Sequence, residues 1–293
     1  MKKVLTLFVF LVLGSSTLFS QWEDRFEKIA ESNAELYAQP FATAFGTAMN
    51  SGAYHSADVA DFFGFSISFQ GMYIMIPDDQ LKFTPILPSG YEANKPIATI
   101  FGDKGAAYAG PDGYIALPSG LDVNKVPMVM PQIGLSLLGT EALFRYVPSI
   151  DVGGKKLSLL GLGAKHEISR YIPLLPVDIS VQVLYSKFQV TDLIDVKNLA
   201  FNAHASMTFG VLTPYAGLQY EATNLDLTYQ IKGDPLNGDP NLRVDKKVSF
   251  ELEGDNSVRA TFGAALKLAV FVLNADVSFG SQTVLCGGLS FEF

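Results

Sequence analysis

The chain has 293 residues, of which 48% are hydrophobic, 12% aromatic and 17% charged, an apolar composition for a secreted soluble protein. Its formal net charge of -8 provides no basic surface for phosphates, so we expect no nucleic-acid partner. The one cysteine, Cys286, has no second cysteine with which to form an intramolecular disulfide, and we interpret it as a small strand residue.

Residues 1–20 have the pattern of a secretory signal peptide. Lys2 and Lys3 precede the apolar run Val4 to Leu13, and small polar residues follow it. An apolar run of about ten residues is too short to span a bilayer as a helix. We therefore expect cleavage near Ser20 or Gln21 and an envelope location for the mature chain.

Residues 21–60 are expected to form a helical, plug-like segment. Trp22 to Ala38 is charged and helix-prone, and Pro40 is expected to interrupt the helix. The next stretch, Phe41 to Ala57, is small and neutral, which suits a plug inside a barrel lumen. An ordered periplasmic helix packed on the barrel rim explains the same residues equally well. The candidate plug residues are Phe41, Gly46, Asn50, Gly52 and His55.

Beyond residue 60, apolar and polar residues alternate with a period of two, which indicates β-strands. In Leu199 to Phe209, for example, the odd positions are apolar and the even positions include Asn202 and Ser206. Such runs match the roughly 9 to 11 residues that a tilted strand needs to cross hydrocarbon. The expected strands are Phe62 to Ile76, one within Thr84 to Leu117, Ile133 to Val147, Leu157 to Arg170, Val177 to Val190, Leu199 to Phe209, Thr213 to Tyr229, Val258 to Lys267, Phe271 to Phe279 and Thr283 to Phe293.

These strands predict an all-β fold, a transmembrane antiparallel β-barrel over residues 61–293 with about 10 strands, within a range of about 8 to 14. A sheet that spans lipid can have no open edge, because each unpaired backbone group costs several kcal/mol there. A soluble barrel or sandwich with an apolar interior is the competing interpretation, since alternation alone does not say which face is wet.

Aromatic residues near the expected strand ends favour the membrane, where girdles of aromatic side chains lie at both interfaces. They are Tyr171, Tyr185, Phe209, Tyr215, Tyr229, Phe271 and Phe293.

The last eleven residues, Thr283 to Phe293, end on an aromatic residue and have apolar or small residues at every second position counting back. This ending is typical of outer-membrane barrels, so Phe293 and Phe291 should face lipid while Glu292 and Ser290 face inward. The strand is also the expected contact with the barrel-assembly machinery, and outer-membrane lipid is the expected surrounding.

Both termini are expected to lie on the periplasmic side, with the longer loops outside. The clearest external loop is Lys232 to Asn256, which is dense in turn residues. Within it, Val244 to Leu252 could extend the barrel as a hairpin above the membrane.

Charged residues of both signs are expected on the inward face of the strands. They could lock a small barrel shut through ion pairs or line a narrow polar channel, and the sequence leaves both open. The candidate lumen-facing residues are Arg145, Lys165, Asp178, His204, Glu221, Arg259, Lys267 and Asp276.

Signatures of catalysis and metal binding are sparse. The three histidines, His55, His166 and His204, have no spacing typical of a metal pair. His204 and Ser206 share one strand face and are the only candidate base and nucleophile, although a hydrogen-bonded lumen histidine explains His204 as well. We expect no catalytic site, metal or cofactor.

One outer loop contains oxygen ligands that could suit Ca²⁺, but their spacing does not match an EF-hand, and we interpret them as a solvated turn. They are Asp234, Asn237 and Asp239.

Six short stretches and the terminal strand Thr283 to Phe293 are distributed over most of the mature chain. The stretches are Pro40-Phe41 with Met49-Asn50-Ser51-Gly52, Gly64-Phe65-Ser66-Ile67-Ser68, Ile76-Pro77-Asp78, Arg145-Tyr146-Val147-Pro148, Tyr171-Ile172-Pro173-Leu174-Leu175-Pro176 and Asn256-Ser257-Val258-Arg259. In this order they resemble a family of uncharacterised envelope proteins of Bacteroidota-type bacteria. The resemblance implies a barrel of unknown function. More distantly, a helical segment before a barrel is similar to the long-chain fatty-acid transporters of the outer membrane, although Phe41 to Ala57 lacks their Asn-Pro-Ala motif.

Three functions are compatible with a barrel in the outer membrane of a Gram-negative cell. The first is a channel or transporter for small or hydrophobic solutes, with Phe41 to Ala57 as its hatch. The second is a closed structural or surface-interaction barrel without transport. The third, an outer-membrane enzyme, has only His204 and Ser206 in its favour, so we expect a protein that is not an enzyme.

Overall fold

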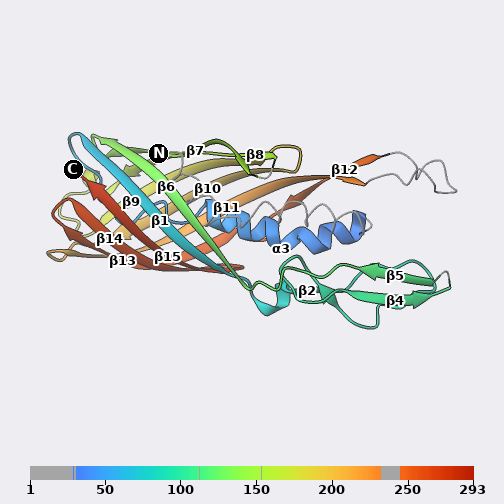
Figure 1. The fold of residues 1–293 in the computed structure, drawn as a ribbon. Coiled ribbons are helices and arrows are strands. Elements are labelled where there is room, and N and C mark those ends of the chain that lie inside the picture. Colours follow the sequence, from blue (N-terminus) through green and yellow to red (C-terminus); the bar gives the residue numbers. More distant parts are fainter. Residues whose placement is uncertain (1–28, 30, 112, 153, 232–244) are drawn as a thin grey trace.

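The computed structural model describes residues 29, 31–111, 113–152, 154–231 and 245–293. An eleven-stranded antiparallel sheet closes on itself through ten strands, and β12 (Lys246–Glu253) lies outside the ring (Figure 1). The ring strands are β1 (Gly64–Met75), β6 (Lys125–Leu137), β7 (Thr140–Val152), β8 (Lys155–Glu167), β9 (Asp178–Val190), β10 (Ile194–Ser206), β11 (Leu212–Ile231), β13 (Val258–Leu268), β14 (Phe271–Phe279) and β15 (Thr283–Glu292). The remaining elements are the helix α3 (Glu31–Met49), the single turns η1 (Asp78–Gln80) and η2 (Ser169–Tyr171), and the short strands β2 (Lys82–Phe83), β3 (Ile97–Ala98), β4 (Ala106–Gly110) and β5 (Gly113–Leu117).

Every strand of the ring has two hydrogen-bonded neighbours. β1 pairs with both β6 and β15, so the first and last ring strands meet, and β10 pairs with β9 and β11. β11 is long enough to pair with β13 over Leu212–Tyr220 and with β12 over Asn224–Ile231. The prediction of a closed antiparallel barrel of ten strands with an N-terminal helix is therefore confirmed.

Two of the expected strands were nevertheless wrong, and the two errors cancel in the count. The segment Ile133 to Val147 is not one strand but the end of β6 and the start of β7, which are joined by Leu138 and Gly139. Both turn residues have positive φ, +53° and +73°, as a tight type I′ hairpin turn requires. The strand expected within Thr84 to Leu117 is absent from the ring, because that region forms only the short strands β3, β4 and β5.

The two ends of the barrel differ. At one end the strands are joined by short connections such as Leu138–Gly139, and Phe293 lies there too, bonded through its backbone to Phe65. At the other end are the 76–124 connection and the β11–β12 hairpin. We call these the short-turn end and the long-loop end. Pairing of β12 with β11 confirms the expected hairpin, although residues 232–244 of its loop lie outside the described part of the chain.

Near the short-turn end the outer face of the barrel is apolar and the inner face is polar. β10 shows the pattern: Phe201 points outward and is 52% exposed, whereas Asn202 and His204 point inward and are buried. β15 follows the same rule, with Phe291 outward and Ser290 inward, as expected from the sequence. Outward apolar and inward polar side chains are the arrangement of a barrel wall in lipid.

Towards the long-loop end the two faces exchange their polarity. In the same strand β10, Ile194 and Val196 point inward and are buried, while Asp195 and Lys197 point outward. These outward charges form ion pairs across strands, for example Lys197 Nζ with Asp226 Oδ2 at 3.7 Å. A polar outside around an apolar inside is the arrangement of a water-soluble domain, so the apolar outer belt ends part-way along the strands.

Two of the expected girdle aromatics were wrong, and the exchange of polarity accounts for one of them, Tyr229, whereas Tyr215 lies opposite Ser206 in the half with a polar inner face. Tyr215 and Tyr229 lie on the inward face and are only 4% and 2% exposed. Tyr229 packs edge-on against Phe250 of β12 in the apolar interior of the long-loop end. The other five expected girdle residues are exposed: Tyr171, Tyr185, Phe209, Phe271 and Phe293.

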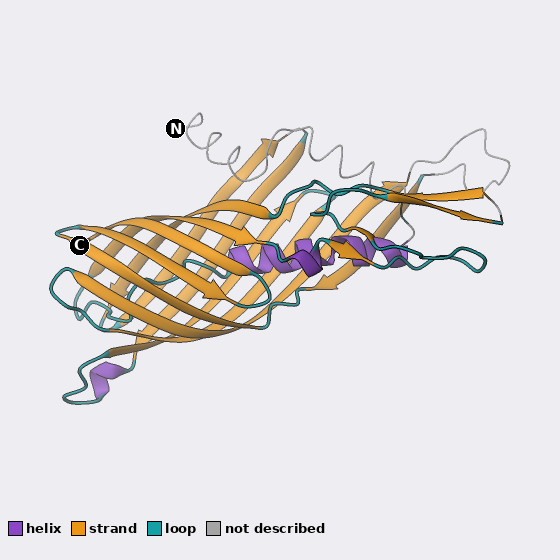
Figure 2. Cartoon of the chain, turned by 90° about the horizontal axis from the view of Figure 1, so that it is seen from below, coloured by secondary structure: helices purple, strands orange, loops and turns teal. Residues whose placement is uncertain are grey.

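The helix α3 enters the barrel from the long-loop end, with its start beside β12 and its end within the lumen (Figures 1 and 2). It does not end before Pro40 as expected, because Pro40 lies within it and the helix continues to Met49. Its alanines, such as Ala38 and Ala42, are fully buried against the apolar inner wall of the long-loop end. The part of the expected helix from residue 22 to 28 lies outside the described residues. In the part of the chain that the structure describes, no helix has the length and apolar character needed to cross a membrane.

Residues 31–60, which we call the lumen segment, run the length of the barrel. At the long-loop end, Asn33 Nδ2 donates to the Ile86 carbonyl at 2.8 Å. At the short-turn end, the Ala60 carbonyl accepts from Gly139 N at 3.1 Å. The described chain thus starts at one end of the barrel and finishes with Phe293 at the other, while the N-terminus that was expected on the periplasmic side lies outside the described residues.

The 76–124 connection folds over the start of α3 and forms a cap. Ile100 N donates to the Tyr37 carbonyl at 3.0 Å, and the Tyr37 hydroxyl donates to the Ser119 carbonyl at 3.0 Å. Phe101 also packs against Phe41 of the helix, with ring centroids 6.4 Å apart. These contacts close the long-loop end around α3, while the β4–β5 finger projects away from the barrel (Figure 1).

Candidate functional site in the barrel lumen

The lumen segment leaves regular structure after Met49 and continues to Ala60 through the polar half of the barrel. Backbone carbonyls in a buried segment without secondary structure need other hydrogen-bond partners. Side chains of the barrel wall supply them, and we call this set the polar sleeve. It consists of Gln132, Arg145, Lys165, Glu167, Ser180, Gln182, Ser206, Gln219 and Arg259.

Arg145 on β7 is fully buried and binds the end of α3. Its Nη1 donates to the Met49 carbonyl at 2.7 Å and its Nη2 to the Ser51 carbonyl at 2.8 Å. Its Nε donates to Gln132 Oε1 at 3.0 Å. A guanidinium beside the last carbonyls of a helix also complements the negative end of the helix dipole. Arg145 therefore holds the point at which the chain leaves the helix.

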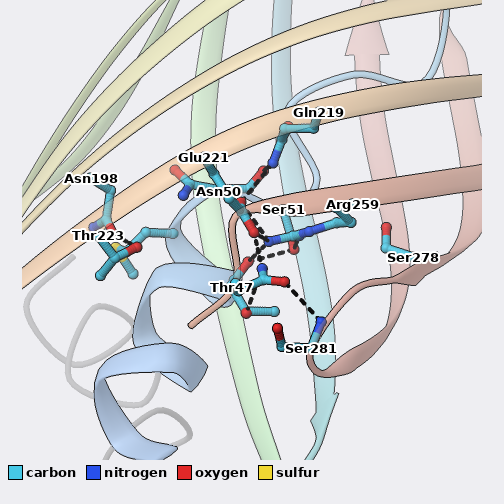
Figure 3. Close-up of polar contacts among 12 residues, drawn as sticks. Thr47, Asn50, Ser51, Asn198, Gln219, Glu221, Thr223, Arg259, Ser278 and Ser281 are labelled. Atoms are coloured by element: carbon cyan, nitrogen blue, oxygen red, sulfur yellow. Dashed lines mark hydrogen bonds and ion pairs between the residues drawn. The ribbon is translucent and has the colours of Figure 1, made fainter. Parts of the chain in front are cut away.

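Arg259 on β13 forms the second buried anchor (Figure 3). Its Nη2 lies 2.7 and 2.8 Å from the two carboxylate oxygens of Glu221 and donates to the Thr47 carbonyl at 3.0 Å. Its Nη1 bonds the Ser51 hydroxyl, while Glu221 also accepts from Gln219 and Asn256. A buried ion pair is stable only when its remaining hydrogen-bonding groups find partners, and Thr47 and Ser51 of the lumen segment are among them.

Uncharged side chains of the sleeve bind the carbonyls that follow. Gln219 donates to Asn50 at 3.2 Å, Gln132 to Gly52 at 3.1 Å and Gln182 to Ala53 at 3.3 Å. These glutamines were not singled out from the sequence. The sequence pattern could have identified them, since each is a polar residue at an inward position of a strand with alternating apolar and polar residues.

The sleeve continues to the short-turn end. Ser180 donates to the Ala57 carbonyl at 2.5 Å, and Ser206 Oγ accepts from Ala57 N at 2.9 Å. Lys165 Nζ lies 3.4 Å from the Ser56 carbonyl, and Glu167 Oε2 accepts from Val59 N at 3.3 Å. The polar inner face of the barrel is therefore matched to the backbone of the lumen segment.

Two glycines allow the lumen segment to approach the wall closely. A side chain at Gly46 would overlap Thr223 of β11. Gly52 has a φ of +63°, and a Cβ there would lie 3.0 Å from Gln70 Cβ and 3.2 Å from Cys286 Sγ. Cys286 is buried and unpaired, with its thiol 3.7 Å from Gln70 Oε1.

All eight candidate lumen residues lie at inward positions of their strands, but they do not form one cluster. Arg145, Glu221 and Arg259 surround the end of α3, as described above. Asp276 accepts a hydrogen bond from the Tyr215 hydroxyl at 2.8 Å. The other four lie nearer the short-turn end: Lys165, Asp178, His204 and Lys267.

The candidate plug residues take different places in the lumen. Phe41 packs on Phe45 within the apolar interior, with ring centroids 4.6 Å apart. Gly46 and Gly52 make the close approaches already described, and Asn50 is buried between them. His55 Nε2 lies 2.7 Å from Glu292 Oε1 at the short-turn end.

His204 and Ser206 are not arranged as a base and a nucleophile. His204 stacks on Tyr54 at 4.0 Å, and its Nδ1 bonds Asn202 Oδ1 at 2.8 Å. Ser206 Oγ binds the lumen segment, and no hydrogen bond joins the two side chains among the described residues. His166 points outward and contacts Thr140 and Tyr171.

The described residues include no group of histidine, cysteine or carboxylate side chains suited to a metal ion. The candidate calcium ligands Asp234, Asn237 and Asp239 fall in 232–244, outside the described residues.

A cavity of about 320 Å³ lies at the short-turn end, between the lumen segment and the wall. Its charged lining comprises His55, Asp58, Glu141, Lys165, Lys267 and Glu292. Lys165 Nζ lies 3.4 Å from Glu141, and Lys267 Nζ lies 3.6 Å from Glu292. Asp58 is among the lining residues, and loss of hydration, reinforced by the nearby Glu167 carboxylate, raises the pKa of its carboxyl group.

Comparison with known proteins gives one match in sequence. The family described as "Family of unknown function (DUF6588)" matches residues 1–293. No curated protein matches the chain.

Three solved barrels that resemble this chain do so at low TM-scores. Salmonella typhi OmpF in complex with daunomycin has 10% identity and a TM-score of 0.26, covering 78% of this chain and 97% of its own. The attachment invasion locus protein Ail of Yersinia pestis, in complex with a heparin analogue, has 8% identity and a TM-score of 0.20, covering 79% and 99%. The Ralstonia pickettii toluene transporter TbuX has 10% identity and a TM-score of 0.23, covering 84% and 92%. Similarity at this level carries no functional argument.

Proposed function

We propose that this chain, which belongs to the family of unknown function DUF6588, is an outer-membrane β-barrel whose own N-terminal segment closes the lumen and whose long-loop end serves surface interaction. After removal of residues 1–20, residues 21–60 are the plug and residues 61–293 the barrel. Outer-membrane lipid surrounds the apolar belt, and the assembly machinery receives the last strand.

The apolar belt and the two kinds of connection support the orientation. Outward residues such as Phe201 suit lipid, whereas the outward charges Asp195 and Lys197 suit water above it. Bacterial barrels have short periplasmic turns and longer extracellular loops. The long-loop end, with the cap and the β11–β12 hairpin, is then at the cell surface.

The observation that carries the closed state is the polar sleeve. From Thr47 to Ala57, side chains of the wall bind carbonyl after carbonyl of the lumen segment, and buried Arg145 and Arg259 bind three of them. Each such bond stabilises the closed state by about 0.5–1.5 kcal/mol, and more where the donor is charged. If the segment left the lumen, water would have to replace all of these hydrogen bonds at once. The polar inner face therefore favours the state in which the lumen segment fills the barrel.

The cap supports a role in surface interaction. The tip of the β4–β5 finger presents Tyr114, which is 80% exposed, and Ile86 of the same connection is 58% exposed. Large apolar and aromatic side chains that project from a rigid support are typical of contact surfaces.

Planar-bilayer conductance tests the closed lumen. We expect the mature protein to give no stepwise current, and a variant lacking residues 22–57 to conduct. As a control, replacement of residues 107–116 in the finger by Gly-Ser should leave the barrel closed, because the finger lies outside the lumen. Steady conductance by the intact protein would contradict the proposal, as would a folded plug-less barrel that does not conduct.

Gated transport of a small solute is the second candidate, and the cavity at the short-turn end favours it. The lumen segment does not fill this part of the lumen. A solute could bind there before the plug moves. Uptake by the intact protein that stops when the plug is fixed to the wall would support this alternative.

A further inference from the structure

We propose that the cavity at the short-turn end is a binding site for a small solute with a primary ammonium group, whose partner is the carboxylate of Asp58. The inference goes beyond the proposed function, because the cavity is present whether or not the barrel conducts.

The cavity has the size of a site for a small molecule. Its volume of about 320 Å³ is at the lower end of the range for ligand sites. At about 30 Å³ for each water molecule, it accommodates a solute of roughly ten non-hydrogen atoms. Side chains from the lumen segment and from both flanks of the barrel closure line it, including Ser66, Glu292 and Phe293.

Charge distinguishes Asp58 from the other ionic groups of the lining. Lys165 has Glu141 as a partner, and Glu292 has both His55 and Lys267 within ion-pair distance. Among the described residues, no cation lies within ion-pair distance of the Asp58 carboxylate. The lining therefore contains one carboxylate without a cationic partner.

The surroundings of Asp58 add to its preference for a cation. Its side chain is accessible from the cavity, yet partial loss of hydration and the Glu167 carboxylate raise its pKa. A bound ammonium group would replace the missing hydration and offset the repulsion by Glu167. The more distant ammonium groups of Lys165 and Lys267 partly stabilise the Asp58 carboxylate, so they weaken its attraction for a bound cation and disfavour a solute with a second positive charge.

The rest of the cavity lining suits a solute with a short organic chain. Leu143, Ala265 and Val272 provide apolar surface, and Ser136 and Thr213 provide hydroxyl groups. A solute with an ammonium group on a short aliphatic or hydroxylated chain fits this combination, because the charge fixes its orientation while the chain contacts the apolar wall.

Isothermal titration calorimetry of the mature protein in detergent micelles, with butylammonium chloride as the probe, tests the site. We expect saturable binding to one site, at least about ten-fold weaker binding of butyrate and 1-butanol, and at least about ten-fold weaker binding of butylammonium to Asp58→Asn. The matched control is Asp61→Asn, which changes an exposed carboxylate that pairs with Arg170 outside the cavity and should alter affinity by less than about two-fold.

Heat-modifiable gel mobility establishes that both variants are folded. Three results would overturn the proposal: no saturable heat with butylammonium, equal binding of butyrate, or equal affinity in the wild type and folded Asp58→Asn.

Discussion

Arg145 Nη1 donates a hydrogen bond of 2.7 Å to the carbonyl oxygen of Met49, and so the barrel wall is joined to the last residue of the helix within it. The same guanidinium reaches Ser51 and Gln132. One side chain therefore fixes both the end of α3 and the direction in which the chain continues.

Replacement of Arg145 by methionine should destabilise the barrel by roughly 2–5 kcal/mol, because the carbonyls of Met49 and Ser51 would be left buried without donors. The free energy of unfolding in lipid vesicles, measured with guanidinium chloride, checks the value. Lys104→Met is the control, since Lys104 is exposed on the cap and should change stability by no more than about 0.5 kcal/mol. A similar small effect at Arg145 would show that the lumen segment is not held as described.

The contact between Gly46 and Thr223 predicts a strong coupling between plug and wall. Gly46→Ala should cost about 1–3 kcal/mol, because the new methyl group would overlap the Thr223 side chain. In a Thr223→Gly background, Gly46→Ala should cost much less free energy of unfolding than it does in the wild type. A double-mutant cycle on unfolding free energies measures the coupling, and additive effects of the two substitutions would place Gly46 away from Thr223.

The exchange of polarity along the strands predicts where charge is tolerated on the outer face. Phe201→Arg places a cation in the apolar belt and should destabilise the barrel by roughly 2–4 kcal/mol. Asn224→Arg lies outward beyond the belt, beside Glu251, and should cost less than about 0.5 kcal/mol. Unfolding in vesicles compares the two, and equal costs would rule out a membrane boundary between these positions.

The direction of the lumen segment predicts which residues the cell surface exposes. In a Cys286→Ser background, Ser32→Cys should react with a membrane-impermeant maleimide on intact cells, since Ser32 is exposed at the long-loop end. Leu174→Cys, in the exposed 168–177 connection at the opposite end, should react only after the outer membrane is permeabilised. The reverse pattern of labelling would invert the proposed orientation.

Alternation was sufficient to predict the barrel because it persists through β9, β10 and the last three strands. It could not show that Leu138 and Gly139 form a turn, since the shift of parity there resembles an irregular strand. Nor could alternation show that Tyr229 faces the lumen, because a strand with apolar residues on its inner face has the same period as one with apolar residues on its outer face. Strand pairing was needed to show where the faces exchange.

The candidate site was predictable to a similar extent. The charged residues Arg145 and Arg259 stood out in apolar strands, and both prove to bind the lumen segment. The glutamines of the sleeve did not stand out, because a single uncharged polar residue in a strand suggests no chemistry until its partner is known. The partners are backbone carbonyls, such as that of Gly52, and sequence alone does not bring them to the wall.

The most direct test of the plugged lumen joins Gly52 to the native Cys286. A Cβ at Gly52 would lie 3.2 Å from Cys286 Sγ, close to the separation of about 3 Å between these atoms in a disulfide. Oxidation of Gly52→Cys in outer membranes, followed by mass spectrometry of the linked peptides, should show nearly complete cross-linking, with none in a Cys286→Ser control. Two free thiols in the folded, oxidised variant would contradict a plug that rests against the last strand of the barrel.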